Sequence, residues 1–412
     1  MRVFRFLSSC FLVMISVCFL TWDLFASQWE KTIGGPDDDR GYSVQQTTDG
    51  GYIIAGYSKS SPTVFSDVYL IKIDTDGNKL WEKTFGGPCA DQGNSVQQTT
   101  DGGYIIAGTF ISWNLAGDCD SPDVYLIKTD VSGDKMWEKT FGGPGDDRGY
   151  SVQQTADGGY IIVGYSDSFG VVNNDDVYII KINASGDKIW EKTFGGSRPE
   201  IGYSVQQTSD GGYIIAGGTQ SFGAGVQDVY LIKTDSTGNE IWYKTFGGSN
   251  PDYAESIEQT ADEGYVIVGH TSSFGQSSQQ IYLIKTDTDG NLDWSKTFGG
   301  DFFDWGYAVQ QTTDGGYIIT GSCQQSLGST YNLCLIKTND TGDIEWSNNF
   351  NGWGSAYGHS VQQTADGGYI SAGRTLSLED QNNSDVYLIY YNKISLPKPN
   401  AIPSIPSLLL DD

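Results

Sequence analysis

The sequence predicts an all-β protein, a seven-bladed β-propeller of four-stranded antiparallel blades. Two markers recur seven times along its 412 residues. One is DGGY, which begins at Asp49 in the first unit and reads DEGY in the fifth. The other is a tryptophan at spacings of 52, 56, 53, 52, 52 and 52 residues, namely Trp29, Trp81, Trp137, Trp190, Trp242, Trp294 and Trp346. Repeats of about 50 residues are typical of propellers, because solenoid coils are shorter.

Each unit contains four short β-rich runs in a fixed order. In the first unit, SVQQT (residues 43–47) leads through a TDGG turn to GYIIAG (residues 51–56). A longer loop leads to DVYLIKID (residues 67–74), and a D-x-D-G-N turn leads to KLWEKTF (residues 79–85). Glycine-containing turns between β-rich runs indicate hairpins, and no segment shows the apolar period of a helix.

The two ends of the repeat complement each other. The last unit reaches DVYLIYYNK (residues 385–393) and lacks a following tryptophan strand, whereas QWEKTI (residues 28–33) supplies one ahead of the first unit. We therefore expect the N-terminal strand to pair into the last blade, so that the ring of residues 28–394 closes without an open edge.

The termini outside the ring are predicted to be a targeting segment and a tail. Residues 1–27 resemble a signal peptide, because Arg2 and Arg5 precede an apolar run over residues 6–20. This run is short for a spanning helix, but the bulky residues before position 26 leave a retained N-terminal anchor as the alternative. Residues 395–412 form a proline-rich tail. The protein is thus predicted to be secreted or held at the cell surface, with no integral membrane domain unless residues 1–27 are retained.

Composition excludes several partner classes. The chain carries 51 acidic against 24 basic residues, a formal net charge of −27. Nucleic acids and anionic membranes are therefore excluded as partners, because both require clustered cations. Only two histidines are present, which leaves little basis for histidine-rich metal sites or histidine catalysis.

The repeats resemble known propeller families. The motif D-x-x-G-x-x-x-W, in TDVSGDKMW (residues 129–137), resembles the repeat of pyrroloquinoline-quinone-type propellers. The run from IIAGG to DVYLIKTD and a late tryptophan (residues 214–242) resembles a kelch repeat. Both resemblances imply a propeller over nearly the whole chain. They imply no cofactor, because the vicinal cysteines of the quinone dehydrogenases and the His and Tyr copper ligands of kelch-type oxidases are missing.

An acidic residue precedes the first strand in six of the seven units. These residues are Asp39, Asp91, Asp147, Glu200, Asp252 and Asp304, and the seventh unit has Ala356. One hypothesis is that they accept N–H bonds within the connector between blades. The alternative is a ring of carboxylates that binds Ca²⁺, as in a calcium-dependent adhesion module.

The next position varies where the rest of the repeat does not. It holds Arg40, Gln92, Arg148, Ile201, Tyr253, Trp305 and Tyr357, and the connectors of units six and seven add Phe302, Phe303 and Trp353. Propeller topology places these connectors on one face. We expect the aromatic residues, together with Arg40 and Arg148, to bind a protein or glycan ligand. The alternative is that the rings only cover the core or each other.

Other repeated positions are predicted to be structural. The second glutamine of SVQQT occurs in all seven units, from Gln46 to Gln363, and its amide is expected to bond a neighbouring strand. The repeated tryptophans are expected to pack between blades.

Four cysteines remain after residue 27. Cys89 lies in a connector and Cys119 in the long loop of the same unit, so both fall on one face. Cys323 and Cys334 flank the long loop of unit six. Disulfides Cys89–Cys119 and Cys323–Cys334 are predicted, as suits an exported chain.

The function predicted from these features is a monomeric, non-enzymatic scaffold that binds a protein or glycan. The alternative is an extracellular glycan-active lyase or hydrolase with its site at the channel mouth. Against it, the acidic positions repeat in blade after blade, and His270 and His359 stand in different units.

Overall fold

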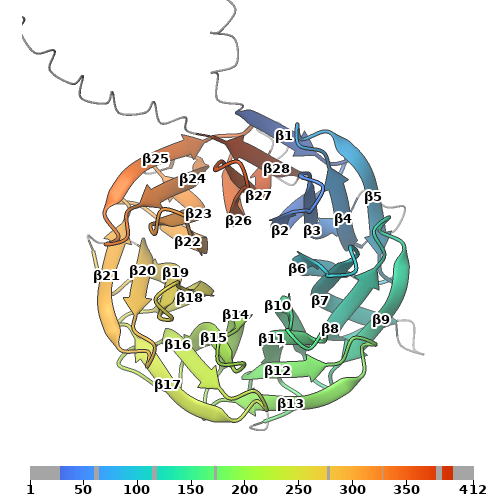
Figure 1. The fold of residues 1–412 in the computed structure, drawn as a ribbon, viewed down its shortest axis with the longest axis horizontal. Helices are drawn as coiled ribbons and strands as arrows, with labels where there is room; N and C mark the ends of the chain where they lie inside the picture. The colour runs from blue at the N-terminus through green and yellow to red at the C-terminus, as the bar shows by residue number, and fades with distance from the viewer. Residues whose placement is uncertain are drawn as a thin grey trace, which may run out of the picture.

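The computed structural model describes residues 28–59, 65–113, 118–170, 174–275, 279–326, 328–376 and 383–392. Within these residues, 28 strands form seven four-stranded antiparallel sheets, which stand as blades around a central axis (Figure 1). The predicted fold class and number of blades are confirmed. The predictions for residues 1–27 and 395–412 fall outside the described residues.

Every blade has the same strand order from the axis outward. The innermost strands of blades 1 to 7 are β2 (Asp39–Gln46), β6 (Gln92–Gln98), β10 (Asp147–Gln154), β14 (Glu200–Gln207), β18 (Asp252–Gln259), β22 (Asp304–Gln311) and β26 (Ala356–Gln363). The second strands are β3 (Tyr52–Ser58), β7 (Tyr104–Trp113), β11 (Tyr160–Ser166), β15 (Tyr213–Thr219), β19 (Tyr265–Thr271), β23 (Tyr317–Gln324) and β27 (Tyr369–Leu376). The third strands are β4 (Asp67–Ile73), β8 (Cys119–Thr129), β12 (Asp176–Ile182), β16 (Asp228–Thr234), β20 (Gln280–Thr286), β24 (Tyr331–Thr338) and β28 (Ser384–Tyr391). The outer strands are β5 (Lys79–Phe85), β9 (Lys135–Phe141), β13 (Lys188–Phe194), β17 (Glu240–Phe246), β21 (Leu292–Phe298), β25 (Ile344–Phe350) and β1 (Trp29–Ile33).

The first strand of the described chain closes the ring, as predicted. Strand β1 pairs antiparallel with β28, with Trp29 opposite Tyr390 and Ile33 opposite Val386. Figure 1 shows β1 beside β28 in blade 7. Blade 7 therefore has four strands like the others, and the ring has no open edge.

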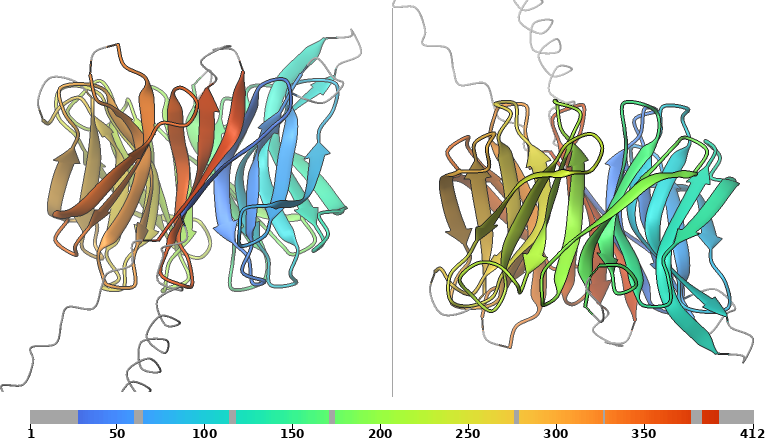
Figure 2. Two further views of the ribbon diagram at one scale, coloured as in Figure 1. Left: turned by 90° about the horizontal axis from the view of Figure 1, so that it is seen from above. Right: turned by 90° about the horizontal axis from the view of Figure 1, so that it is seen from below.

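The ring has two different faces, seen edge-on in Figure 2. On the turn face, tight turns join the innermost to the second strand and the third to the outer strand. On the loop face, connectors join successive blades and longer loops join the second to the third strand. Because Trp29 pairs with Tyr390, at the end of β28, both ends of the described chain lie on the turn face.

The core lies between blades. The second and third strands are buried on both sides, as their Ile, Val, Leu and Tyr residues require, whereas the outer strands alternate exposed and half-buried positions. Each repeated tryptophan packs on the DGGY tyrosine of the next blade, with ring centroids 5.6 to 6.1 Å apart. The predicted role of the tryptophans is confirmed.

Hydrogen bonds between innermost strands run around the axis. The first glutamine of each SVQQT, or Glu258 in blade 5, accepts a backbone N–H from the next blade at 2.5 to 2.6 Å. The second glutamine accepts one from the preceding blade's turn at 2.8 to 2.9 Å. An innermost strand has one edge without a strand partner, so these side chains satisfy its N–H groups. The structural role predicted for the second glutamine is confirmed.

Ion pairs fix the turn face, a feature that sequence analysis did not predict. In blade 3, the buried Lys181 donates to the Asp157 carboxylate of the DGG turn and to the Ile182 carbonyl. Five further blades repeat this pair. In blade 7, Tyr390 replaces the lysine and donates its hydroxyl to Asp366 at 2.6 Å.

Both predicted disulfides, Cys89–Cys119 and Cys323–Cys334, are present. Such bonds form and persist in oxidising compartments, which supports the predicted export in general terms. A search of the described ranges finds no helix with the length and apolar character needed to cross a membrane.

Candidate functional site

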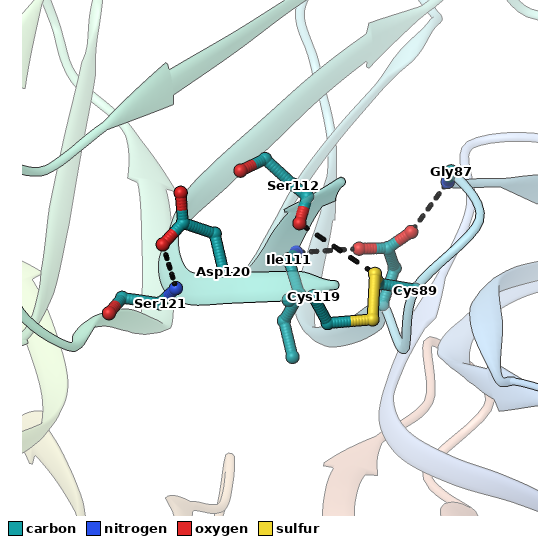
Figure 3. The surroundings of a disulfide bond; sticks show 8 residues. Gly87, Cys89, Ile111, Ser112, Cys119, Asp120 and Ser121 are labelled. Atoms are coloured by element: carbon teal, nitrogen blue, oxygen red, sulfur yellow. Dashed lines mark hydrogen bonds between the residues drawn. A yellow bond between two sulfur atoms is a disulfide. The ribbon is translucent and has the colours of Figure 1, made fainter. Parts of the chain in front are cut away.

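The connector carboxylates are buried and stabilise the connectors by accepting hydrogen bonds from the backbone. Asp91 accepts the N–H of Gly87 at 2.6 Å and that of Ile111 at 2.9 Å. Figure 3 shows Gly87 and Ile111 near the Cys89–Cys119 disulfide. The other five accept the N–H of the second glycine of their own connector in the same way. This arrangement fits the first hypothesis for these residues, hydrogen bonding within the connector.

The six connector carboxylates are buried rather than exposed on the rim. Asp39, Asp91, Asp147, Glu200, Asp252 and Asp304 are 0 to 2% exposed, because each connector folds back over its own carboxylate. Burial also raises the pKa of Asp91 to about 6, and the Asp67 carboxylate adds to this shift. In the part of the chain that the structure describes, no group of three or more His, Cys, Asp or Glu side chains could hold a metal ion.

A layer of side chains lines the channel below the loop face. In each innermost strand a β-bulge falls two residues after the variable position, so one residue has no partner on the second strand. A bulge re-aims the side chain of its extra residue. The seven bulge residues are Tyr42, Asn94, Tyr150, Tyr203, Glu255, Tyr307 and His359.

Blade 5 alone places carboxylates in this layer and in the glutamine ring. Burial raises the pKa of Glu255 to about 8 and that of Glu258 to about 7. Glu258 lines a central cavity of about 240 Å³ whose other walls are the repeated Val or Ile and first Gln residues. Near pH 7 the channel therefore holds carboxyl groups that are partly or mostly protonated.

Both histidines are poor proton-transfer groups. His359 lies between Tyr42 and Tyr307, with ring centroids 5.2 and 5.0 Å away, and burial lowers its pKa to about 3. His270 stacks on Tyr253 at 4.4 Å, and burial lowers its pKa to about 4. Both rings are neutral at pH 7, far from the pKa that suits a general base.

The residues at the variable position of blades 6 and 7, Trp305 and Tyr357, belong to a stack of aromatic rings. Trp305 stacks on Tyr331 with centroids 5.1 Å apart, and Tyr331 contacts Tyr357 at 5.4 Å. Phe303 extends the row at 6.1 Å from Trp305. At the other end, the Arg374 guanidinium carbon lies 4.4 Å from the centre of the Tyr357 ring. We call Phe303, Trp305, Tyr331 and Tyr357 the aromatic row.

Three other predicted ligand residues make contacts of their own outside this row. Tyr253 packs on His270 within blade 5. Arg40 pairs with Asp38 at 3.1 Å and Arg148 with Asp146 at 3.8 Å, in blades 1 and 3. The positive charges of Arg40 and Arg148 are therefore partly neutralised by these carboxylates.

Neighbouring residues of the two aromatic connectors lie in different surroundings. Phe303 is 42% exposed beside Trp305, whereas Phe302 lines a separate cavity between blades 5 and 6. Trp353 is 72% exposed, and its backbone N–H is held by Thr375 Oγ1 at 3.0 Å. A single ligand surface of all eight predicted residues is thus not assembled.

Sequence reasoning missed three residues of this region. Arg374 stands opposite Tyr357 in the strand register, where the second strand also varies from blade to blade. Glu255 occupies the bulge position, which reads Tyr, Asn, Tyr, Tyr, Glu, Tyr and His around the ring. Comparing these two positions across units would have found both residues. Tyr331 opens β24 at a register position where Pro122 stands in blade 2 and Ser384 in blade 7, so this position also varies between units.

Comparisons with known proteins identify the fold. No family model and no curated protein matches the chain. Sqt1 from Chaetomium thermophilum, solved bound to the N-terminus of ribosomal protein L10, is similar at a TM-score of 0.50 and 11% identity over 88% of this chain and 98% of that chain. The Pan2 WD40 domain from Neurospora crassa reaches 0.51 and 9% identity over 89% and 99%. At such identities the likeness shows a WD40-type propeller fold alone, and the finer kelch and quinone-type assignment has no family match.

Proposed function

We propose that this protein is an exported, monomeric, non-enzymatic scaffold that binds an extended protein segment on the loop face of blades 6 and 7. The observation that carries the proposal is the aromatic row, in which connectors and loops of two blades bring four rings together. The repeat itself does not need these rings, because other blades hold Arg, Gln or Ile at the position of Trp305.

The geometry of the row favours a peptide over a sugar. Trp305, Tyr331 and Tyr357 cover one another's faces, so mainly their edges are left for a ligand. Sugars stack on open ring faces, whereas extended peptides dock along aromatic-lined grooves. Arg374 at the end of the row supplies a cation for a carboxylate or backbone carbonyl. Sqt1, solved with the N-terminus of a ribosomal protein, provides a precedent for peptide binding by this fold.

Glycan binding is a second candidate because of one residue. Trp353 is 72% exposed, a value that leaves ring surface available for a sugar. A glycan-active enzyme is less well supported. Its carboxylates in the channel would be Glu255 and Glu258, and the Glu258 carboxylate already accepts the Gln311 N–H, as the glutamines of the other blades accept theirs.

The test is a screen of the exported protein on peptide and glycan arrays, followed by titration of the best probe. The double variant Trp305→Ala and Tyr357→Ala should weaken peptide binding by at least tenfold, because hot-spot aromatic residues each contribute about 2 kcal/mol or more. Trp113→Ala is the matched control, since Trp113 is 50% exposed in β7 on the same face. Equal binding by the double variant and the control would contradict the proposal. Binding that depends on Trp353 and a glycan probe would favour the second candidate.

A further inference from the structure

Six of the seven blades fill the same internal volume with a tyrosine. It is the third residue of DVY in the third strand, or of QIY in blade 5, and is at most 6% exposed, namely Tyr69, Tyr125, Tyr178, Tyr230, Tyr282 and Tyr387. In blade 3, Tyr178 lies under the loop residue Phe169 at 5.6 Å and donates its hydroxyl to Glu191. Lys188 then pairs with Glu191 at 2.6 Å.

Blade 6 replaces all three members of this group. The strand register places Cys334 at the position of Tyr178, because Cys334 is opposite Gly321 just as Tyr178 is opposite Gly164. Ser347 stands at the position of Glu191, and Ile344 stands at the position of Lys188. Both assignments follow from aligning Trp346 with Trp190, because the two tryptophans hold the same register. The blade thus loses a phenol ring, a carboxylate and an ammonium group at one place.

The lost side chains leave a cavity of about 440 Å³, which we call the blade 6 cavity. The Cys323–Cys334 disulfide, Ile336 and Ile344 line it from blade 6, and Phe298 and Phe302 line it from the adjoining outer strand and connector. Ser347 and Asn349 add polar atoms. An apolar cavity of about 150 Å³ is already large enough to bind benzene, so a substituted ring fits here.

We infer that the blade 6 cavity is a receptor site for a phenol ring, supplied by a tyrosine side chain of a protein partner. The other six blades show which group this volume accepts, because each seats a phenol there in contact with the same strands. In blade 6 the ring would lie against the disulfide and Phe302, and its hydroxyl would reach Ser347, at the position of the glutamate that receives Tyr178. The charged residues that line the cavity, Asp301 and Asp304, are both acidic, which suits a neutral tyrosine and disfavours phosphotyrosine by like-charge repulsion.

The inference rests on the proposed function only for the source of the ring. The blade 6 cavity and the aromatic row meet in one connector, where Phe302 lines the cavity and Phe303 joins the row. A peptide lying along the row therefore passes the connector that borders the cavity. The fit of a phenol to the cavity does not depend on that peptide.

The first experiment titrates the whole exported protein with p-cresol, the tyrosine side chain itself, by NMR. A dissociation constant of roughly millimolar size is expected for so small a ligand. Toluene, which lacks the hydroxyl, should bind about fivefold more weakly because it makes no hydrogen bond. No saturable p-cresol binding would overturn the inference.

Two double variants locate the site. Cys323→Thr with Cys334→Tyr restores the residues of blade 5 and fills the cavity from within, so p-cresol binding should be lost. Cys323→Ser with Cys334→Ala also removes the disulfide but leaves the cavity open, so binding should persist within about threefold. Equal p-cresol binding by both variants would place the ligand elsewhere and refute the inference.

A tyrosine pentapeptide, acetyl-Gly-Gly-Tyr-Gly-Gly-amide, tests the source of the ring. It should compete with p-cresol at similar or higher affinity, whereas a peptide with alanine in place of tyrosine should not. If p-cresol binds and the tyrosine peptide does not, a partner's tyrosine side chain is excluded as the occupant. The Trp305→Ala and Tyr357→Ala variant should bind p-cresol normally, so failure of the proposed function is distinguishable from failure of this inference.

Discussion

The turn face and the loop face differ in how strictly the blades keep the same residues. On the turn face, six blades keep the same buried lysine and aspartate, and Tyr390 preserves the hydrogen bond in the seventh. On the loop face, Trp305, Tyr331 and Cys334 stand where other blades have different residues. A strict repeat position is one that the ring needs for stability. A broken position, meaning one where a blade departs from the residue that the other blades share, is free of that requirement and is available for binding.

This comparison gives a rule with two directions. Substitution away from the repeat at a strict position should cost stability and leave binding unchanged. Substitution toward the repeat at a broken position should preserve or raise stability, and should remove whatever activity that position supports. The following three predictions test the rule, from the largest expected effect to the smallest.

The largest effect is expected for Tyr178→Ala in blade 3, which converts a filled site into an open one like that of blade 6. Loss of a buried aromatic ring should lower the free energy of unfolding by about 3 to 5 kcal/mol, measured by urea denaturation. Tyr178→Phe keeps the ring and loses the bond to Glu191, so it should cost only about 1 kcal/mol. Added p-cresol should recover part of the loss in the alanine variant alone. Equal losses in the two variants would contradict the role assigned to the ring.

An intermediate effect is expected for Glu258→Gln, which restores the glutamine ring. Burial raises the pKa of Glu258 from 4.5 to about 7. A raised pKa means that the stability of the folded wild type is fully present below pH 4.5 and falls as the pH rises through 7. The free energy of unfolding of the variant should therefore equal that of the wild type at pH 5 and exceed it by about 2 kcal/mol at pH 9. This difference is smaller than the full pKa shift implies, because water in the channel screens the charge. Urea unfolding at the two pH values measures this difference.

The reverse change in blade 4 is the control for Glu258. Gln206→Glu should leave stability unchanged at pH 5 and lower it by a similar amount at pH 9, because Gln206 holds the same position and bonds Gln259 N–H. A difference from wild type that does not vary with pH in either variant would show that charge in the channel is not the cause.

The smallest effect is expected for Glu263→Gly in the DEGY turn. Glu263 has a φ of 67°, while glycine occupies the corresponding left-handed position in the other turns, as Gly211 does with φ 82°. A left-handed residue with a side chain costs about 1 to 2 kcal/mol, and the greater freedom of glycine when unfolded offsets part of it. Thermal unfolding should show a net gain of about 0.5 to 1 kcal/mol. Gly211→Glu, where an added side chain meets open space, should show a loss of similar size.

The fold was predictable from sequence because the repeat encodes it redundantly. Seven copies of a tryptophan and a DGGY turn fix the strand number, and the N-terminal QWEKTI fixes closure. The cysteine pairs were predictable for a related reason, since the topology alone brings Cys89 to the same face as Cys119 and places Cys323 beside Cys334.

The candidate site was less predictable because it depends on local geometry within the repeat. A bulge turns Glu255 into the channel, and no single unit reveals that bulge. Successive residues of one connector separate, so that Phe302 lines the blade 6 cavity while Phe303 joins the aromatic row. The connector carboxylates were located correctly but are buried, because their role is to bond the chain that covers them.

The pairing of Trp29 with Tyr390 also determines which face of the ring is nearest to an attached group. Since both ends of the described chain leave from the turn face, an anchor, a fusion partner or an immobilising tag joined directly at residue 28 or 392 would be attached on that side. The loop face, with the aromatic row and its neighbouring connectors, then points away from the support. Immobilisation at either end of the described ring is thus suited to binding assays of this face.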